Sequence, residues 1–145
     1  MFNGNVLVAT DGSALSERAV EMAARLAAKV GANLTAVAVA APYPYSAVGE
    51  SSAVAGADYQ ARVGAEASDR LARAKEIAAE AGADCRTSLQ EASEVFRGIL
   101  AAAEQTGAGL VVMASHGRRG LSALMLGSET QKLLAHSTVP VLVVR

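Results

Sequence analysis

The sequence contains 145 residues, of which 52% are hydrophobic and 19% are charged, and its formal net charge at pH 7 is −1. A nearly neutral chain argues against a protein that holds nucleic acid by phosphate contacts, because such proteins carry a clear basic surplus. The apolar content and the small net charge disfavour intrinsic disorder, and the apolar runs are far shorter than the about 20 residues that cross a membrane. With one cysteine, Cys85, no intramolecular disulfide can form. Residues 1–12 lack the pattern of a secretion signal. We therefore predict one domain over residues 1–145, located in the cytoplasm and not inserted into a membrane.

The start of the chain predicts a strand, a turn and a helix. Residues 5–9 form a short apolar run that ends in Thr-Asp-Gly-Ser, a pattern typical of a buried strand before a turn. Residues 14–30 follow a helical period, with Ser13 placed to cap the helix and Gly31 placed to end it. The apolar face expected for this helix contains Val20, Ala23, Ala24 and Ala27.

The next part of the chain predicts two strands around a long helix. Residues 34–40 form an alternating apolar strand, and residues 41–56, rich in Pro, Gly and small residues, predict a loop. Loops of that length are commonly functional lids or mobile segments. A helix is expected over 57–81, and a more polar strand, suited to a sheet edge, over 83–89. The inward stripe expected for the helix is Val63, Ala67, Leu71, Ala74 and Ala78.

The remainder of the chain continues the alternation of helices and strands. Ser93 is expected to cap a helix that Gly107 ends. The elements expected after it are a buried strand over 110–114, a glycine-rich loop over 115–127, a helix over 128–136 and a strand over 139–144. Strands separated by helices predict an α/β fold, with a mostly parallel open sheet and helices on both of its faces.

The loop over 115–127 has the composition of a phosphate site. Its glycines let backbone amides turn towards a ligand at positive φ, and such amides form anion-binding nests. Ser128 begins a helix with Gln131 at a capping-box spacing, so a phosphate there would meet free N–H groups and the positive end of the helix dipole. The glycines are Gly117, Gly120 and Gly127, and the basic residues beside them are His116, Arg118 and Arg119. The alternative stays open that the glycines only make turns and the arginines are solvated.

Two further segments are expected to open onto the same crevice, because ligands of open α/β sheets bind beyond the carboxyl ends of the strands. Asp11 can accept hydrogen bonds from ribose hydroxyls or help to hold a phosphate-bound cation. The structural alternative for Asp11 is an Asx turn ahead of the helix. The small apolar residues 38–40 suit a flat base, although they suit any buried strand equally well.

Several motifs of nucleotide-binding and catalytic proteins are absent from the sequence, namely the P-loop, the dinucleotide G-x-G-x-x-G fingerprint and the G-x-S-x-G nucleophile elbow. The candidate acid–base groups near the expected crevice are Asp11, His116 and Glu129. Because they form no convincing catalytic set, the sequence favours binding over turnover.

Four blocks in order carry a family resemblance: Val-Leu-Val-Ala-Thr-Asp-Gly-Ser, Val-Val-Met-Ala-Ser-His-Gly-Arg-Arg-Gly, Leu-Gly-Ser and Val-Pro-Val-Leu-Val-Val-Arg. Over essentially its whole length the chain resembles the universal stress protein family. The resemblance implies a Rossmann-like sheet of five parallel strands in the order 3-2-1-4-5, usually in a homodimer. Members of its ATP-binding branch carry G-x-x-G, nine residues, then G-[ST]. Gly117 and Gly127-Ser128 keep this spacing, while Ala114 replaces the first glycine, adding a methyl beside the expected ligand path and restricting φ.

The resemblance also implies a ligand, which is ATP, or AMP or ADP, with Mg²⁺ carried on the nucleotide. Asp11 would lie near the ribose, the phosphates and that Mg²⁺, and Val39 would contact adenine through its backbone. No residue is assigned a catalytic role. The nucleotide-binding residues carried over by position are Ala9, Thr10, Asp11, Val39, Met113, Ala114, His116, Gly117, Arg118, Gly120, Gly127, Ser128 and Glu129.

The leading hypothesis is a dimeric adenine-nucleotide-binding regulator of the stress response. The strand over 139–144 would pair with its copy, because an exposed edge strand needs a cover, unless its own chain shields it. Two other functions stay open. One is a slow ATPase or self-phosphorylating protein with Ser115, His116 or Ser128 as acceptor. The other is an interaction module that binds no nucleotide, with Ala114 marking the loss.

Overall fold

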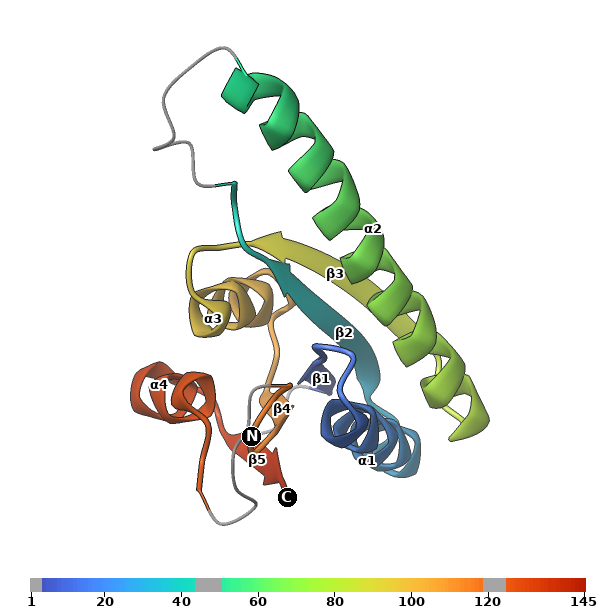
Figure 1. The fold of residues 1–145 in the computed structure, drawn as a ribbon. Coiled ribbons are helices and arrows are strands. Elements are labelled where there is room, and N and C mark those ends of the chain that lie inside the picture. The colour runs from blue at the N-terminus through green and yellow to red at the C-terminus, as the bar shows by residue number, and fades with distance from the viewer. Residues whose placement is uncertain (1–3, 44–50, 119–124) are drawn as a thin grey trace.

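The computed structural model describes residues 4–43, 51–118 and 125–145, and of residues 51–54 only the backbone. Strands and helices alternate along the chain (Figure 1). The strands are β1 (Asn5–Ala9), β2 (Asn33–Ala40), β3 (Cys85–Glu91), β4 (Leu110–Ala114) and β5 (Val141–Val144). The helices are α1 (Ala14–Val30), α2 (Ser51–Glu80), α3 (Val95–Thr106) and α4 (Ser128–His136).

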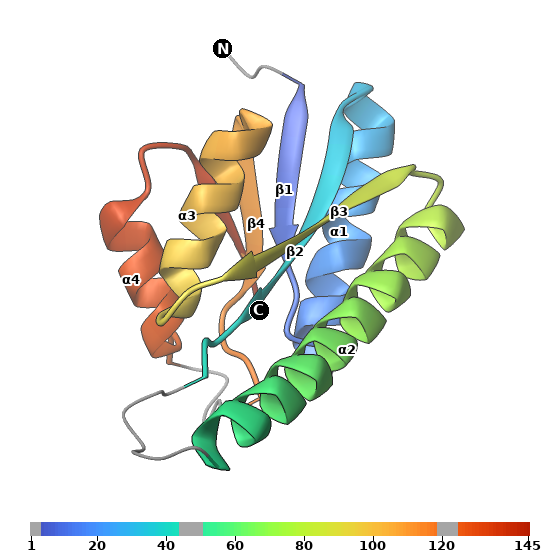
Figure 2. The same cartoon turned by 90° about the horizontal axis from the view of Figure 1, so that it is seen from above.

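The strands form one parallel sheet in the order β3-β2-β1-β4-β5, which confirms the predicted fold class. β1 lies at the centre, with Val6 opposite Leu34 of β2 on one side and Leu110 of β4 on the other. Helices α1 and α2 cover one face of the sheet, and α3 and α4 cover the other (Figures 1 and 2). β3 is an edge strand, as its polar sequence predicted, and β5 is the opposite edge.

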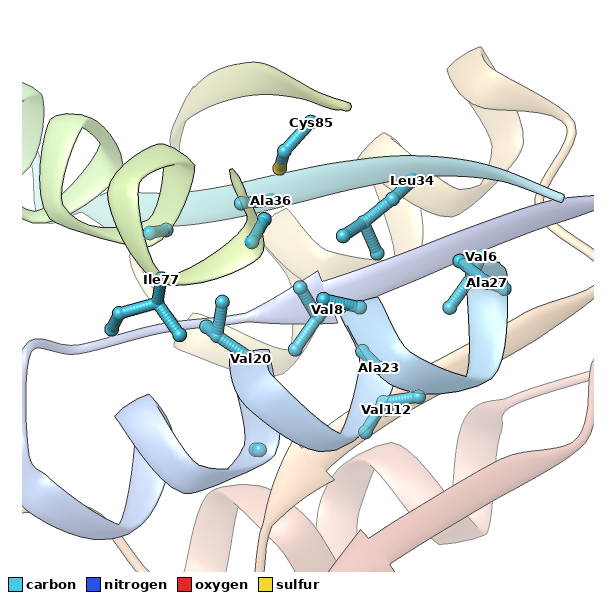
Figure 3. Packing of buried hydrophobic residues seen from close by; sticks show 14 of the residues in the cluster. Val6, Val8, Val20, Ala23, Ala27, Leu34, Ala36, Ile77, Cys85 and Val112 are labelled. Atoms are coloured by element: carbon cyan, nitrogen blue, oxygen red, sulfur yellow. The ribbon is translucent and has the colours of Figure 1, made fainter. Parts of the chain in front are cut away.

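Two apolar cores follow from the alternation of side chains along the strands. Val6 and Val8 of β1 point towards α1 and α2, where Val20 and Ile77 also lie (Figure 3). Leu7, between them in sequence, belongs to the second core with Ile99 of α3, because successive side chains of a strand point to opposite faces. The first core relies on alanine in α1 and α2, which lets these helices pack closely on the sheet.

Helix α1 has the expected boundaries, with Ser13 accepting a hydrogen bond from the Ser16 N–H and Gly31 ending the helix at a φ of 70°. Helix α2 differs, because it starts at Ser51 although residues 41–56 were predicted to be a loop. Alanine is the best helix former, and this outweighs the cost of about 1 kcal/mol for a glycine inside the helix. Residues 44–50 of that loop lie outside the described part of the chain. None of the helices in the described ranges has both the length and the hydropathy to cross a membrane.

Two predicted helix caps are wrong. Glu94, not Ser93, precedes α3, and the Phe96 N–H is capped from a distance by the Glu129 carboxylate of α4, at 2.8 Å. The N-cap of α4 is Gly127, and the side chain of Gln131 donates to the Leu126 carbonyl instead of closing a capping box with Ser128. In each case a tertiary or loop contact satisfies a terminal backbone group that the sequence pattern assigned to a local side chain.

Candidate functional site

A cavity of about 550 Å³ opens at the carboxyl ends of β1 and β4. This is the point at which the strand order reverses, because β1 leads through α1 to β2 on one side while β4 lies on the other. All thirteen candidate residues except Gly120, which lies outside the described ranges, line it together. The wall also contains residues that the sequence did not single out, namely Ser16, Val37, Arg70, Val95, Ile99 and Thr130.

Helix α4 is anchored directly to the end of β4. The Gly127 N–H donates to the Ser115 carbonyl at 2.7 Å, and the buried Thr130 hydroxyl donates to the Ala114 carbonyl at 3.0 Å. These two bonds place the first turn of α4 in the cavity wall, where Gly127 and Ser128 lie. Because first-turn N–H groups have no acceptor within a helix, they are suited to hold an anion.

Asp11 connects the two loops that flank the cavity. Its Oδ1 accepts a hydrogen bond from the Ser13 N–H at 2.9 Å, which makes the Asx turn of the structural alternative. Its Oδ2 accepts from the Arg118 N–H at 3.0 Å, across 107 residues of sequence. Burial alone would raise the pKa of the Asp11 carboxyl, but hydrogen bonds from Ser13, Ser16 and Arg118 outweigh it, so this pKa is lowered from its usual value. Asp11 therefore stays ionised at neutral pH and joins the turn after β1 to the loop after β4.

We expect Asp11→Asn to lower the free energy of unfolding by about 1–3 kcal/mol at neutral pH, because an amide cannot accept both bonds. A carboxyl with a lowered folded-state pKa stabilises the fold above its unfolded pKa, and that contribution is lost as the pH falls through the folded value. The difference in stability between wild type and variant should therefore shrink below about pH 4. Urea unfolding at several pH values measures it, and a difference that stays constant down to pH 3 would contradict this role.

The glycines of the loop matter because they have no side chain, and not because they adopt a positive φ. The prediction of positive φ is wrong for Gly117 and Gly127, and Gly12, in the turn after β1, has a φ of 78° instead. A Cβ at Gly117 would overlap the Asp11 carboxylate, and one at Gly127 would lie 3.3 Å from the His116 Cα. Glycine at these positions therefore lets two loops and a helix approach closely.

The apolar end of the cavity depends on a glycine in α3. Val39 of β2 lines the cavity, and a Cβ at Gly98 would lie 2.6 Å from one of the Val39 methyl groups. Gly98 is buried, so Val39 sits against bare helix backbone. Glycine at this position therefore lets α3 approach the end of β2 closely.

Two helical glycines offer a matched comparison. Gly98→Ala should destabilise the protein by about 1–3 kcal/mol through overpacking against Val39. Gly64→Ala, on α2 with no atom within 4 Å of its added Cβ, should stabilise it by about 0.5–1 kcal/mol through helix propensity. Urea unfolding of both variants tests this, and stabilisation by both alanines would show that the Val39 contact is not tight.

Residues 3–145 match the model of the universal stress protein family. The chain belongs to this family. It is 36% identical to the universal stress protein YxiE of Bacillus subtilis, with each chain covered in full. Among solved structures, the universal stress protein UspA from Lactobacillus plantarum superposes with a TM-score of 0.85 at 22% identity, covering 100% of this chain and 99% of that one.

A second solved structure, described as a universal stress protein in complex with cAMP, is 26% identical with a TM-score of 0.73. The two chains are covered to 97% and 96%. The fold predicted from the resemblance to universal stress proteins is therefore confirmed. The cAMP complex is a property of that neighbouring protein.

The departure from the family motif at Ala114 is small in structural terms. Ala114 is the last residue of β4, and no described residue other than glycine has a positive φ. The expected restriction of φ therefore has no consequence here, because the strand does not need the freedom of glycine. What remains is one methyl group in the cavity wall, which narrows the site without closing it.

Glu129 and His116 are both engaged within the protein. The carboxylate of Glu129 caps α3, so its contribution to the cavity comes from its place in the first turn of α4. His116 lies 3.3 Å from the Ser115 hydroxyl, measured from its Nδ1. Within the described ranges no group of three His, Cys, Asp or Glu residues is arranged to hold a metal ion.

Arg70 is the cavity residue of greatest chemical interest among those that the sequence did not predict. It lies on α2, beside the stripe of Ala67, Leu71 and Ala74 that packs on the sheet. The sequence does show a basic residue at the border of a buried helical stripe. It does not show which strands have their carboxyl ends next to that part of the helix. The position of Arg70 in the cavity wall is decided by the path of α2 across the sheet.

Proposed function

We propose that this universal stress protein binds an adenine nucleotide, with ATP as the leading candidate, in the cavity at the ends of β1, β2 and β4. The observation that carries the proposal is that one cavity gathers the candidate residues from four separate segments of the chain. A volume of about 550 Å³ is in the range of cofactor sites. The cAMP complex of a structural neighbour at 26% identity supports the same class of ligand.

One part of the cavity wall is apolar and another is positively charged, which matches the apolar base and the charged phosphates of a nucleotide. Val37, Val39, Ile99 and Met113 provide an apolar end that suits a base. The first turn of α4, with the nearby Arg118, provides a positive end that suits phosphate. Asp11 lies in the wall with them, and a ribose hydroxyl would donate to its carboxylate, which has acceptor capacity beyond the Ser13 and Arg118 N–H groups. Mg²⁺ would arrive on the phosphates, since one carboxylate with water and phosphate oxygens is a common magnesium environment.

The cavity is better suited to binding a nucleotide than to transferring a phosphoryl group. Ser115 is only 1% exposed, so its hydroxyl is a poor acceptor for phosphate. His116 and Ser128 line the cavity, but a nucleophile needs an adjacent activating base, and the carboxylate of Glu129, next to Ser128, is engaged in capping α3. Transfer remains an outcome to test by intact mass after incubation with Mg-ATP, where a gain of one phosphate would establish it.

We further propose that the protein acts as a homodimeric regulator, with the segment 139–144 as the interface. β5 is an edge strand of the sheet, and Leu142 is 38% exposed on it. An apolar edge with unpaired backbone groups is covered well by a second copy of the same strand. Sedimentation velocity over a range of concentrations measures the oligomeric state.

The test of nucleotide binding is a thermal-shift titration of nucleotide-stripped protein with Mg-ATP, with Mg-GTP as the control. A ligand present at about 100 times its Kd adds about 2.7 kcal/mol of stability, which raises the Tm by several degrees. A saturable rise with ATP and little with GTP is expected. No shift at millimolar ATP would overturn the proposal and favour an interaction module that binds no nucleotide.

A further inference from the structure

A second cavity adjoins the first beyond Gly12. Its volume is about 190 Å³, and it is bounded by the turn after β1, the start of α1 and the middle of α2. The two cavities share Thr10, Arg70 and Arg118 in their walls. The side chains of these two arginines therefore form part of the wall that the two cavities have in common.

Arg70 and Arg118 converge on the same glycine from different elements. A Cβ placed on Gly12 would lie 2.8 Å from Nη2 of Arg118 and 3.0 Å from Cγ of Arg70. Both side chains thus pack against the bare backbone of the turn after β1. Arg70 comes from α2 and Arg118 from the loop after β4, so only the folded chain brings the two together.

These two arginines form only one ion pair with the described residues, and that pair is long. The ion pair of Arg70 is with Glu66 at 3.9 Å, and the Glu66 side chain is 55% exposed. Such a pair contributes little in water. Arg118 forms no ion pair with another described residue. An anion would compete for Arg70 only with this long, exposed pair, and for the Arg118 guanidinium with no described carboxylate.

The acidic residues of the second cavity do not cancel this charge. Glu17 and Asp69 lie in its wall, but Glu17 is paired with Arg73 at 3.5 Å. Arg73 is also paired with Glu76 at 3.2 Å, so it is the arginine of this cavity whose charge is already matched. The wall of this cavity thus holds three arginines against the two carboxylates of Glu17 and Asp69. Two more carboxylates lie next to it, since Asp11 accepts from the Arg118 N–H and Glu66 is paired with Arg70.

We propose that Arg70 and Arg118 form a clamp over Gly12 that holds the outer phosphates of a nucleotide, so that the site selects di- and triphosphates over monophosphates. This inference rests on the proposed nucleotide binding and names the ligand class within it. A single phosphate is satisfied by the first turn of α4, whereas the second and third extend towards the shared wall of the two cavities. Guanidinium groups suit this task because they donate several hydrogen bonds in a planar fork to phosphate oxygens.

The test is isothermal titration of nucleotide-stripped protein with AMP, ADP and ATP, each with Mg²⁺. Wild type should bind ATP at least about tenfold more tightly than AMP, and Arg70→Met should weaken ATP binding by about tenfold or more. AMP binding should change by less than about twofold, because AMP does not reach the clamp. Arg70→Lys, which keeps the charge, should recover part of the loss.

A control variant separates this local role from a general change of charge. Arg62→Met removes the same charge from the same helix at a position that lines neither cavity, and ATP affinity should not change. Circular dichroism and urea midpoints verify that each variant is folded. Inorganic tripolyphosphate should displace ATP from wild type more effectively than inorganic phosphate does, and Arg70→Met should remove that advantage.

The possible failures are distinguishable. If wild type binds ATP but Arg70→Met binds it equally tightly, the clamp is wrong and the nucleotide site stands. If Arg70→Met weakens AMP and ATP equally, Arg70 does not select by phosphate number, and the clamp is again overturned. If wild type binds none of the three nucleotides, nucleotide binding fails and the clamp with it.

Discussion

Leu133→Ala should lower the free energy of unfolding by about 2–5 kcal/mol, the cost of emptying a fully buried leucine site. Leu133 is 0% exposed and packs with Phe96, Ile99 and Val111 in the core beneath α3 and α4. Helix α4 has Leu133 as its one large buried residue, since Thr130 is the other side chain that it buries. Removing the leucine therefore weakens the attachment of the helix whose first turn borders the cavity.

The next residue of the same helix provides the control. Leu134 is 43% exposed, so Leu134→Ala should change the free energy of unfolding by less than about 0.5 kcal/mol. Urea unfolding of both variants gives the comparison directly, because the amino-acid change and the helix are the same. Equal losses in the two variants would mean that α4 is not anchored through Leu133.

Gly127→Val should weaken ATP binding by about 100-fold or more, provided that the nucleotide occupies the cavity, because losing about two hydrogen bonds from first-turn N–H groups of α4 to a charged phosphate costs this much. The sequence alone suggests that a valine would fill the phosphate path. The structure gives a different reason, since an added Cβ would lie 3.3 Å from the His116 Cα and 3.4 Å from the Ser115 carbonyl oxygen. The γ methyl groups of valine would push the start of α4 away from the end of β4.

This displacement should also be visible without a ligand. Overpacking of this kind costs about 1–3 kcal/mol of stability, and Gly127→Ala, with one methyl, should lie between wild type and valine. The backbone at Gly127 has a φ of −62°, which alanine and valine adopt without strain, so the loss of stability in both variants comes from the added side chain. Titration with Mg-ATP and urea unfolding of both variants test the argument. A valine variant with wild-type affinity and stability would show that the contact between Gly127 and His116 can relax freely.

The fold was accessible from the sequence because it depends on local patterns. Apolar runs such as residues 5–9 and 110–114 mark buried strands, and Gly31 and Gly107 end the helices before the following strands, both in the left-handed conformation. Strands that alternate with helices can close into few arrangements other than a parallel sheet. The strand order came from the resemblance to universal stress proteins, which the family match and the structure confirm.

The location of the candidate site was also accessible, since it lies where parallel strands end and the order reverses. The sequence therefore determined the elements, the family and the edge of the sheet to examine. What only the tertiary structure decided are contacts between residues far apart in the chain: Asp11 with Arg118, Glu129 capping α3, Val39 against Gly98, and Arg70 beside Gly12. Local periodicity places a residue on a face of its own element, but not opposite a residue of another. That pairing depends on how helices cross the sheet, and crossing is set by the packing of both cores together.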